Sequence, residues 1–499
     1  MAVDEQKLAE SINSQIEHDK GKHNNGKKKH GKSQKNGGKG SKVSAEHIAE
    51  VRAQREQAKK AKRDAMIAKG LDPDCPPDLR FIRRPMLSIV PKGTPSTGFS
   101  FRLMTYNCLA QALIRRKLFP TSGNALKWFK RSQVLLHEFK YYNADVQCLQ
   151  EVDYIQYQSF WKDEFSKLGY DSQFHRHGTK NHGIAIVWKR ELFTMSDKML
   201  VDYDQEVTGH ISPRTTTKNV GLVLALNFTQ KVLDQFPNSS KRGILVGTTH
   251  LFWHPFGTFE RTRQCYIVLA KMKEFEHRVK LLQNSDGAQG EWTPFFCGDF
   301  NSQPFDAPYL SMCSKPVDYK GRARTVIECS TSYTFSKARD GEECGDEEGG
   351  NIEKFGDGQP EHPVPSEFHA NDEQKKLVED MESLHNSIDM RATSIYSAAY
   401  KHVHVENAGL DNDFNEPEIS NWAETWRGLL DYIFVIRKWD YSDRTVPDDI
   451  ENLQKDADIR IRSLLRMPSS REMPDHGQPH EGEYGSDHLS MMCEIELNM

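Results

Sequence analysis

Short apolar runs recur along the chain from about residue 85 onward, separated by polar turns and two longer amphipathic stretches. The runs predict buried strands, and they include "FRLMTYNCLA", "ADVQCLQEV", "HGIAIVWKR", "NVGLVLALNF", "RGILVGTTHLFW", "TPFFCGDFN", "GLLDYIFVI" and "SDHLSMMCEIEL". The amphipathic stretches predict helices over residues 125–142 and 257–280. Strands with intervening helices are typical of an α/β or α+β domain whose helices lie outside its sheets.

Two segments depart from this pattern. Residues 1–84 read as a basic, largely disordered tail, with a polar helix predicted over residues 45–69 because alanine, lysine, arginine and glutamate dominate there. The folded domain is predicted to occupy residues 85–499. Within it, the glycine- and glutamate-rich residues 339–382 are predicted to form a solvated acidic insertion loop.

The formal net charge of -4 conceals a strong asymmetry. Residues 1–69 carry a net charge of +8, and residues 339–382 carry -11. The basic tail suits either an electrostatic arm for nucleic acid or a solvated tail without a partner. No apolar stretch has the length of a membrane span, and the first residues lack an apolar signal core. We therefore expect an intracellular protein of the nucleus, nucleolus or cytoplasm, with no membrane partner.

Polar side chains follow or open several of the predicted strands. Asp299 and Asn301 flank Phe300, so in extended chain they point the same way. The other members of this set are Asn107, Glu151, His250, Asp431, Asp487 and His488. One such residue is commonly a cap or a turn residue, but six strand ends of the same kind predict a shared site.

The residue types of this set indicate a chemistry. Carboxylate and amide oxygens without cysteine suit a hard cation, Mg²⁺ or Mn²⁺. Such a cation can hold a phosphate oxygen during in-line attack, an aspartate can orient or deprotonate a water, and a histidine supported by an aspartate can contact the phosphate. The set therefore predicts metal-dependent hydrolysis of a phosphate ester.

The ordered motifs "TYNCLA", "LQEV", "THLFWHP", "GDFNSQP", "LLDYIF" and "SDHLSM" resemble those of the endonuclease/exonuclease/phosphatase superfamily over about residues 98–497. This resemblance implies a four-layer sandwich, with two mixed β-sheets face to face and helices outside. "HLFWHP", "IYSAAY" and "WRGLLDYIF" are similar to the deadenylase-like branch that includes nocturnin and the angel proteins. The lysine-rich tail and "THLFWHPFGTFERTRQ" are most similar to fungal RNA exonucleases of the Ngl group, which trim RNA 3′ ends, including that of 5.8S ribosomal RNA.

The resemblance also implies roles for the strand-end residues. Glu151 would be the main magnesium ligand, with Asn107 beside the metal and the phosphate. Asp299 would orient or deprotonate the attacking water, and Asn301 would position it. The scissile phosphate would lie against His250 and His488. In the same cluster, Asp431 would orient His488, and Asp487 would help with metal or water.

The expected substrate contacts are Trp426 and Pro255, which would sandwich a base, and Arg263, which could reach a phosphate. A core position for Trp426 and a structural salt bridge for Arg263 are the alternatives. Leu109 stands where relatives that cut DNA carry an acid, which argues against DNA repair. His254 stands where the best-known deadenylases carry an acid before the proline, so strict adenine preference is not implied.

The sequence thus leads to a magnesium-dependent 3′-to-5′ exoribonuclease that acts on single-stranded RNA 3′ ends and releases nucleoside 5′-monophosphates. Pre-ribosomal RNA and poly(A) are the candidate substrates. The alternative is a phosphatase of the same fold acting on a small phosphorylated metabolite. A third hypothesis is an RNA-bound scaffold with an inactive site, which would require a cluster residue to be missing.

Overall fold

The structure is a computed structural model that describes residues 45–68, 73, 79–91, 93–115, 118–284, 290–335, 360–423, 426–442, 449–474 and 477–499. The predicted disorder of residues 1–44 lies outside this part of the chain. Where the polar helix was expected, the structure has α2 (Ala45–Ala68), and the side chains of residues 52–68 are exposed apart from half-buried Met66. No helix in the described ranges is both long and apolar enough to cross a membrane.

Two large mixed sheets form the centre of the folded part. The seven-stranded sheet has the order β1-β14-β15-β2-β3-β5-β4. Its strands are β1 (Met86–Ser88), β2 (Phe99–Asn107), β3 (Val146–Asp153), β4 (Tyr170–His175), β5 (His182–Lys189), β14 (Ile459–Leu465) and β15 (Met491–Leu497). Only β2 and β3 pair in parallel, and every other neighbouring pair of this sheet is antiparallel.

The six-stranded sheet has the order β10-β13-β9-β8-β7-β6. Its strands are β6 (Phe193–Asp202), β7 (Val220–Phe228), β8 (Lys241–His250), β9 (Glu291–Asp299), β10 (Met390–Ser394) and β13 (Asp431–Lys438). Here β8 and β9 are the parallel pair. A separate short hairpin pairs β11 (Asn421–Ala423) with β12 (Trp426–Gly428).

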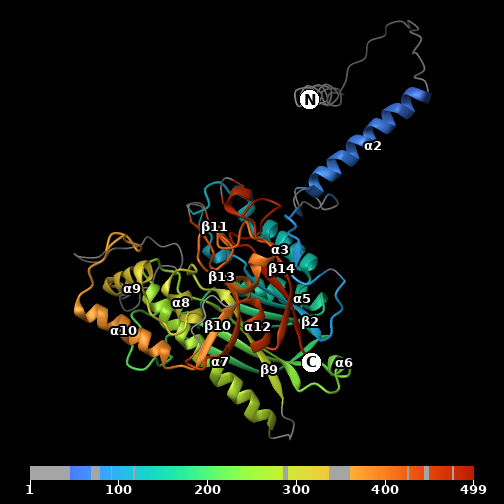
Figure 1. Ribbon diagram of the computed structural model, residues 1–499. Helices are drawn as coiled ribbons and strands as arrows, with labels where there is room; N and C mark the ends of the chain where they lie inside the picture. The colour runs from blue at the N-terminus through green and yellow to red at the C-terminus, as the bar shows by residue number, and fades with distance from the viewer. Residues whose placement is uncertain are drawn as a thin grey trace. The chain divides into compact units, whose positions relative to one another are not determined.

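The two sheets pack face to face through one hydrophobic core. Phe101 of β2 meets Phe295 of β9 with ring centroids 5.8 Å apart. On the outer face of the seven-stranded sheet lie α3 (Trp128–Tyr142) and α5 (Lys162–Lys167), while α7 (Thr258–Asn284) and α8 (Ala307–Cys313) cover the other sheet (Figure 1). The folded part also contains helices α9 (Gly321–Ser332), α11 (Ile395–Ala399) and α12 (Ile450–Asp456). This arrangement confirms the predicted sandwich of two mixed sheets flanked by helices.

The folded part begins earlier than the predicted boundary at residue 85. Phe81 is 1 % exposed and packs in the cluster beneath α3. The guanidinium of Arg84 donates to the carbonyl and the hydroxyl of Ser490, each at 2.7 Å, and lies 3.7 Å from the Glu138 carboxylate. A charged residue that follows a proline-rich break gives no sequence sign of such burial, so the boundary was set too late.

The structure also corrects the C-terminal end of the acidic loop that was predicted over residues 339–382. Residues 336–359 lie outside the described ranges. Residues 372–382 belong to a helix, α10 (Asp372–Asn386), which opens with a capping box between Asn371 and Gln374. Val378 and Met381 of this helix are fully buried against a small hydrophobic cluster. Within residues 372–382, the acidic side chains therefore lie outside the buried face of an amphipathic helix.

Candidate active site

Strand pairing brings the predicted polar residues to one end of the two sheets. His250 ends β8 and lies in register with Asp299, which ends the parallel strand β9. On the other side of Asp299, antiparallel pairing places Asp431 at the start of β13. Asn107 ends β2 in register with Gln150 of β3, in the opposite sheet. The set therefore lies where the ends of both sheets meet.

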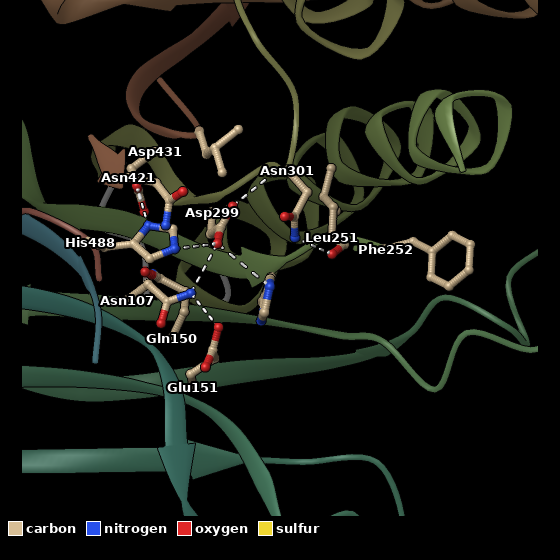
Figure 2. Close-up of polar contacts among 12 residues, drawn as sticks. Asn107, Gln150, Glu151, Leu251, Phe252, Asp299, Asn301, Asn421, Asp431 and His488 are labelled. Atoms are coloured by element: carbon tan, nitrogen blue, oxygen red, sulfur yellow. Dashed lines mark hydrogen bonds and ion pairs between the residues drawn. The ribbon is translucent and has the colours of Figure 1, made fainter. Parts of the chain in front are cut away.

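Asp299 is the centre of this cluster (Figure 2). Its Oδ2 accepts a hydrogen bond from Asn107 Nδ2 at 2.9 Å and lies 3.6 Å from both His250 Nε2 and His488 Nε2. Its Oδ1 accepts from the backbone N–H of Asn301 at 2.8 Å. The carboxylate is 1 % exposed, so its orientation is fixed by protein groups on both sides.

Glu151 faces Asp299 across Asn107. The Nδ2 group of Asn107 also donates to Glu151 Oε1 at 2.7 Å, and the backbone N–H of Ala110 donates to Glu151 Oε2 at 2.9 Å. Glu151 does not follow the end of β3 as the sequence suggested. It lies inside that strand at a register shift between Leu149 and Val152, with φ of 49°. A bulge of this kind turns one side chain out of the strand's alternation, here toward the site.

Burial and the nearby charge of Asp487 raise the pKa of Glu151 to about 7. Burial likewise raises the pKa of Asp487, which is 8 % exposed. Two carboxylates that each resist ionisation in a buried site favour a cation between or beside them. The raised pKa values therefore suit Glu151 as the predicted metal ligand, with the Asp487 carboxyl group nearby in the same site.

His488 is held by Asp431. Its Nδ1 lies 2.7 Å from Asp431 Oδ2, which also accepts from the Ser420 hydroxyl at 2.7 Å. Burial lowers the pKa of His488, but the charges of Asp431 and Asp299 outweigh it and raise that pKa well above its ordinary value. His488 is therefore an imidazolium whose Nε2 proton points toward Asp299, which suits contact with a phosphate oxygen.

The pKa of His250 is shifted in the opposite direction to that of His488. Burial lowers its pKa to about 4, although Asp299 acts in the other direction, so the imidazole is neutral. Its backbone carbonyl accepts from Asn219 Nδ2 at 3.0 Å, which fixes this end of β8. Asn301, with φ of 47°, holds the next loop by donating its side-chain amide to the Leu251 carbonyl at 3.0 Å. The site thus combines one charged and one neutral imidazole beside a single carboxylate.

Gly298 explains how β8 and β9 approach so closely at this point. A Cβ at this position would lie 2.3 Å from the carbonyl oxygen of Thr249, and the residue has φ of 153°. Both facts require glycine, because a side chain would separate the two strands. The close approach is what sets His250 beside Asp299.

A divalent cation fits the donor set. Glu151, Asp299 and His488 each offer a potential ligand atom within 4.8 Å of the others. Glu151 and Asp299 supply the oxygen donors that hard cations prefer, and Asn107 lies between them. Because His488 is protonated and held by Asp431, we assign it to the phosphate rather than to the metal.

The three predicted substrate residues have different outcomes. Trp426, on β12, is 63 % exposed, so the alternative of a core tryptophan is wrong. Pro255 is half-buried. Arg263 is corrected, because its fully buried guanidinium lies 2.7 Å from Glu260 Oε1 and donates to the Tyr203 carbonyl at 2.9 Å. That side chain supports the start of α7 and has no open path to a phosphate.

Two residues of the site were not predicted. Ser420 bridges to Asp431, and Asn421 forms an isolated β-bridge with His488 and donates to the Asp487 carbonyl at 3.3 Å. Ser420 precedes the β11–β12 hairpin and Asn421 opens it, in a stretch without apolar periodicity. No sequence signal distinguishes them from ordinary loop residues.

Residues 104–488 match the sequence profile of the Endonuclease/Exonuclease/phosphatase family, and this span begins just before Asn107 and ends at His488. The chain belongs to the endonuclease/exonuclease/phosphatase family. It is accordingly a phosphodiester hydrolase by class, and the residues of the polar cluster lie within the part of the chain that matches the family.

Comparison with named relatives and with a solved structure shows which members of the family the chain resembles. It is 67% identical over 474 residues to the RNA exonuclease NGL2 of Saccharomyces cerevisiae, covering 93% of this chain and 92% of that protein. It is 44% identical over 471 residues to the probable RNA exonuclease NGL3 of the same yeast, covering 91% and 90%. A solved structure of ANGEL2, a 2′,3′-cyclic phosphatase, matches 84% of this chain and 99% of its own at a TM-score of 0.51 and 19% identity, a likeness of fold. The resemblance of the motifs to this family is confirmed.

Proposed function

We propose that the chain is a magnesium-dependent 3′-to-5′ exoribonuclease that hydrolyses the last phosphodiester bond of single-stranded RNA and releases a nucleoside 5′-monophosphate. The observation that carries the proposal is the buried contact of Asp299 with Asn107, beside two imidazoles. The similarity to two proteins named as RNA exonuclease or probable RNA exonuclease supports RNA as the substrate. Maturation of 5.8S ribosomal RNA and shortening of poly(A) are the processes we propose.

The reaction assigns a task to each side chain. Glu151 would hold the cation, with Asn107 beside it, and the cation when bound would neutralise charge on the phosphate and help to orient it. Asp299 would orient a water and accept its proton, since Asn107 and the Asn301 N–H fix both carboxylate oxygens. His488 would donate from Nε2 to a phosphate oxygen, because Asp431 holds its other nitrogen at 2.7 Å.

The neutral state of His250 gives it a different task. A neutral imidazole can donate one hydrogen bond to a phosphate oxygen without adding a positive charge beside the cation. The exposed indole of Trp426 and the ring of Pro255 would hold the terminal base. His254, next to that proline, accepts from the backbone N–H of Phe256 through Nδ1 at 3.2 Å, so its Nε2 carries the proton of the neutral ring. A donor at this position does not select the amino group of adenine.

The test is digestion of 5′-labelled single-stranded RNA with a poly(A) or a mixed-sequence 3′ end. We expect a ladder that shortens from the 3′ end, requires magnesium, disappears with EDTA and is absent in Asp299→Asn. Asp171→Asn is the matched control, because this exposed aspartate of β4 pairs with Arg190 at 3.3 Å. Intact RNA in the presence of folded, magnesium-loaded protein would contradict the proposal and favour a small phosphorylated metabolite as the substrate.

A further inference from the structure

A small hollow that opens to solvent lies beside the cluster, and His250 is one of its lining residues. Its walls come from both sheets. Lys180 and His182 precede and open β5, and Lys218 and Asn219 lead into β7. Even with the open solvent at its mouth the hollow measures only about 250 Å³, which is below the roughly 300–1,000 Å³ of pockets that enclose a whole small molecule. It therefore suits one group of a larger ligand.

His182 is the most informative residue of this hollow. It is 4 % exposed, and its Nε2 has no hydrogen-bond partner. Burial, and then the charge of Lys180, lower the pKa of His182 well below its ordinary value, so the ring is neutral. A buried polar atom without a partner lowers folding stability, which makes it an expected feature of a binding site rather than of a core.

The charges around His182 are positive. Lys180 lines the hollow together with His182 and His250, and its positive charge lowers the pKa of both imidazoles. Lys218 is held with φ of 51°, and its backbone N–H donates to Asp204 Oδ2 at 2.7 Å, so a constrained turn presents this lysine. No acidic residue lines the hollow within the described ranges. The ligand that such a lining favours is an anion.

We propose that this hollow is a second phosphate subsite, which binds a phosphate of the nucleic-acid strand next to the scissile one. The inference rests on the proposed function, because His250 lines the hollow and also lies 3.6 Å from Asp299. Lys180 and Lys218 supply charge, and His182 Nε2 supplies a hydrogen-bonding atom that currently has no partner. The subsite would make the enzyme prefer a strand with a second phosphate over one that carries only the scissile phosphate.

The test compares three dinucleotides. ApA contains only the scissile phosphate, pApA adds a phosphate on its 5′ side, and ApAp adds one on its 3′ side. We expect kcat/KM for pApA or ApAp to exceed that for ApA by about tenfold, as a charge-assisted hydrogen bond allows. Whichever substrate shows the preference identifies the side of the strand that enters the hollow. Equal kcat/KM values for all three would overturn the proposal.

Variants then locate the effect. In Lys180→Ala and Lys218→Ala, the ratio of kcat/KM for the preferred dinucleotide to kcat/KM for ApA should fall toward one. The change should come mainly from a higher KM for the preferred dinucleotide. Lys231→Ala is the control for loss of a positive charge, since this lysine is 72% exposed and pairs with Glu191 at 3.7 Å, outside the hollow. His182→Leu should lower the same ratio while leaving the melting temperature unchanged or higher. A lower melting temperature with an unchanged ratio would make His182 structural and refute its part in the subsite.

A second measurement separates this inference from the proposed function. If none of the dinucleotides or RNAs is cleaved, the exonuclease proposal fails, but inorganic phosphate can still be titrated against the protein. Histidine side-chain NMR signals should then shift in the parent, with the His182 signal assigned from His182→Leu. The phosphate affinity measured from this shift should be about tenfold weaker in Lys218→Ala. Absence of any phosphate-dependent shift in the parent would overturn the subsite independently of catalysis.

Discussion

Replacing Glu151 with glutamine separates the stability of the site from its function. Without metal, burial and Asp487 hold the pKa of Glu151 at about 7, against an ordinary value of 4.5. An acid with a raised pKa loses stability as the pH rises through its folded pKa, and this loss is about 3 kcal/mol at pH 7. Glutamine does not ionise, so the Glu151→Gln variant should escape it.

The hydrogen bonds act in the opposite direction. Glu151 accepts from Asn107 Nδ2 and from the Ala110 N–H. A glutamine can accept only one of these bonds and must turn its own amide N–H toward the other donor, at a cost of about 1–3 kcal/mol. In EDTA, the free energy of unfolding should therefore lie between the parent value and about 2 kcal/mol above it.

Magnesium should shift this difference in favour of the parent. At ten times its Kd, a ligand that binds only the folded state stabilises the parent by about 1.4 kcal/mol. Glu151→Gln should gain little or none of this stabilisation, and RNA digestion should fall at least about 100-fold. Urea unfolding in EDTA and in magnesium chloride measures the first effect, and the gel assay of 3′-end shortening measures the second.

Glu416→Gln is the matched control. Glu416 is fully buried, burial raises its pKa to about 7, and it accepts from the Tyr309 hydroxyl at 2.9 Å in the core away from the site. We expect magnesium stabilisation and RNA digestion by this variant to equal those of the parent. If Glu151→Gln shows the parent's magnesium stabilisation, Glu151 is not a metal ligand and the reasoning is refuted.

Three further substitutions test other parts of the structure. Trp426→Ala should weaken single-stranded RNA binding to an Asp299→Asn background by about 1–3 kcal/mol in a filter or anisotropy assay, and unchanged affinity would remove the stacking role. Gly298→Ala forces a Cβ against the Thr249 carbonyl and should lower the urea-derived unfolding free energy by at least about 2 kcal/mol, so a neutral result would mean that the strands can separate. Arg263→Ala leaves the buried Glu260 carboxylate without its arginine partner and should lower stability by about 3–5 kcal/mol. The kcat/KM of the folded protein should change little. A selective loss of RNA affinity would instead support the phosphate contact predicted from the sequence.

The strand-end residues were predictable because strands leave a clear signal. Asn107, His250 and Asp299 each end an apolar run, and parallel or antiparallel pairing brings such ends to one edge. Glu151 was identified for a reason that proved inaccurate, since it lies at a bulge inside β3. A bulge changes the side-chain alternation by one residue, and no hydrophobic pattern reveals that before the pairing is known.

Residues whose role depends on distant partners were not predictable. Arg263 begins a helix and is charged, which suits both a phosphate contact and a salt bridge, and only its burial beside Glu260 decides between them. His182 has no local pattern because the hollow is formed by two sheets. For α10 a signal did exist, since Asn371 and Gln374 have the spacing of a capping box, but the surrounding acidic residues obscured it.

The local geometry of the site argues for catalysis over a scaffold with an inactive site. Leu109, Glu151 and Asn301 all adopt positive φ values, a conformation that costs a residue with a side chain on the order of 1–3 kcal/mol. Each of these strained residues also holds the polar network, through contacts to Asn107, to Ala110 or to Asp299. A surface that only bound RNA would need neither the strain nor a buried carboxylate with a raised pKa. The two costs are explained together if the site must present an oriented carboxylate and a ligand for a cation at the same point.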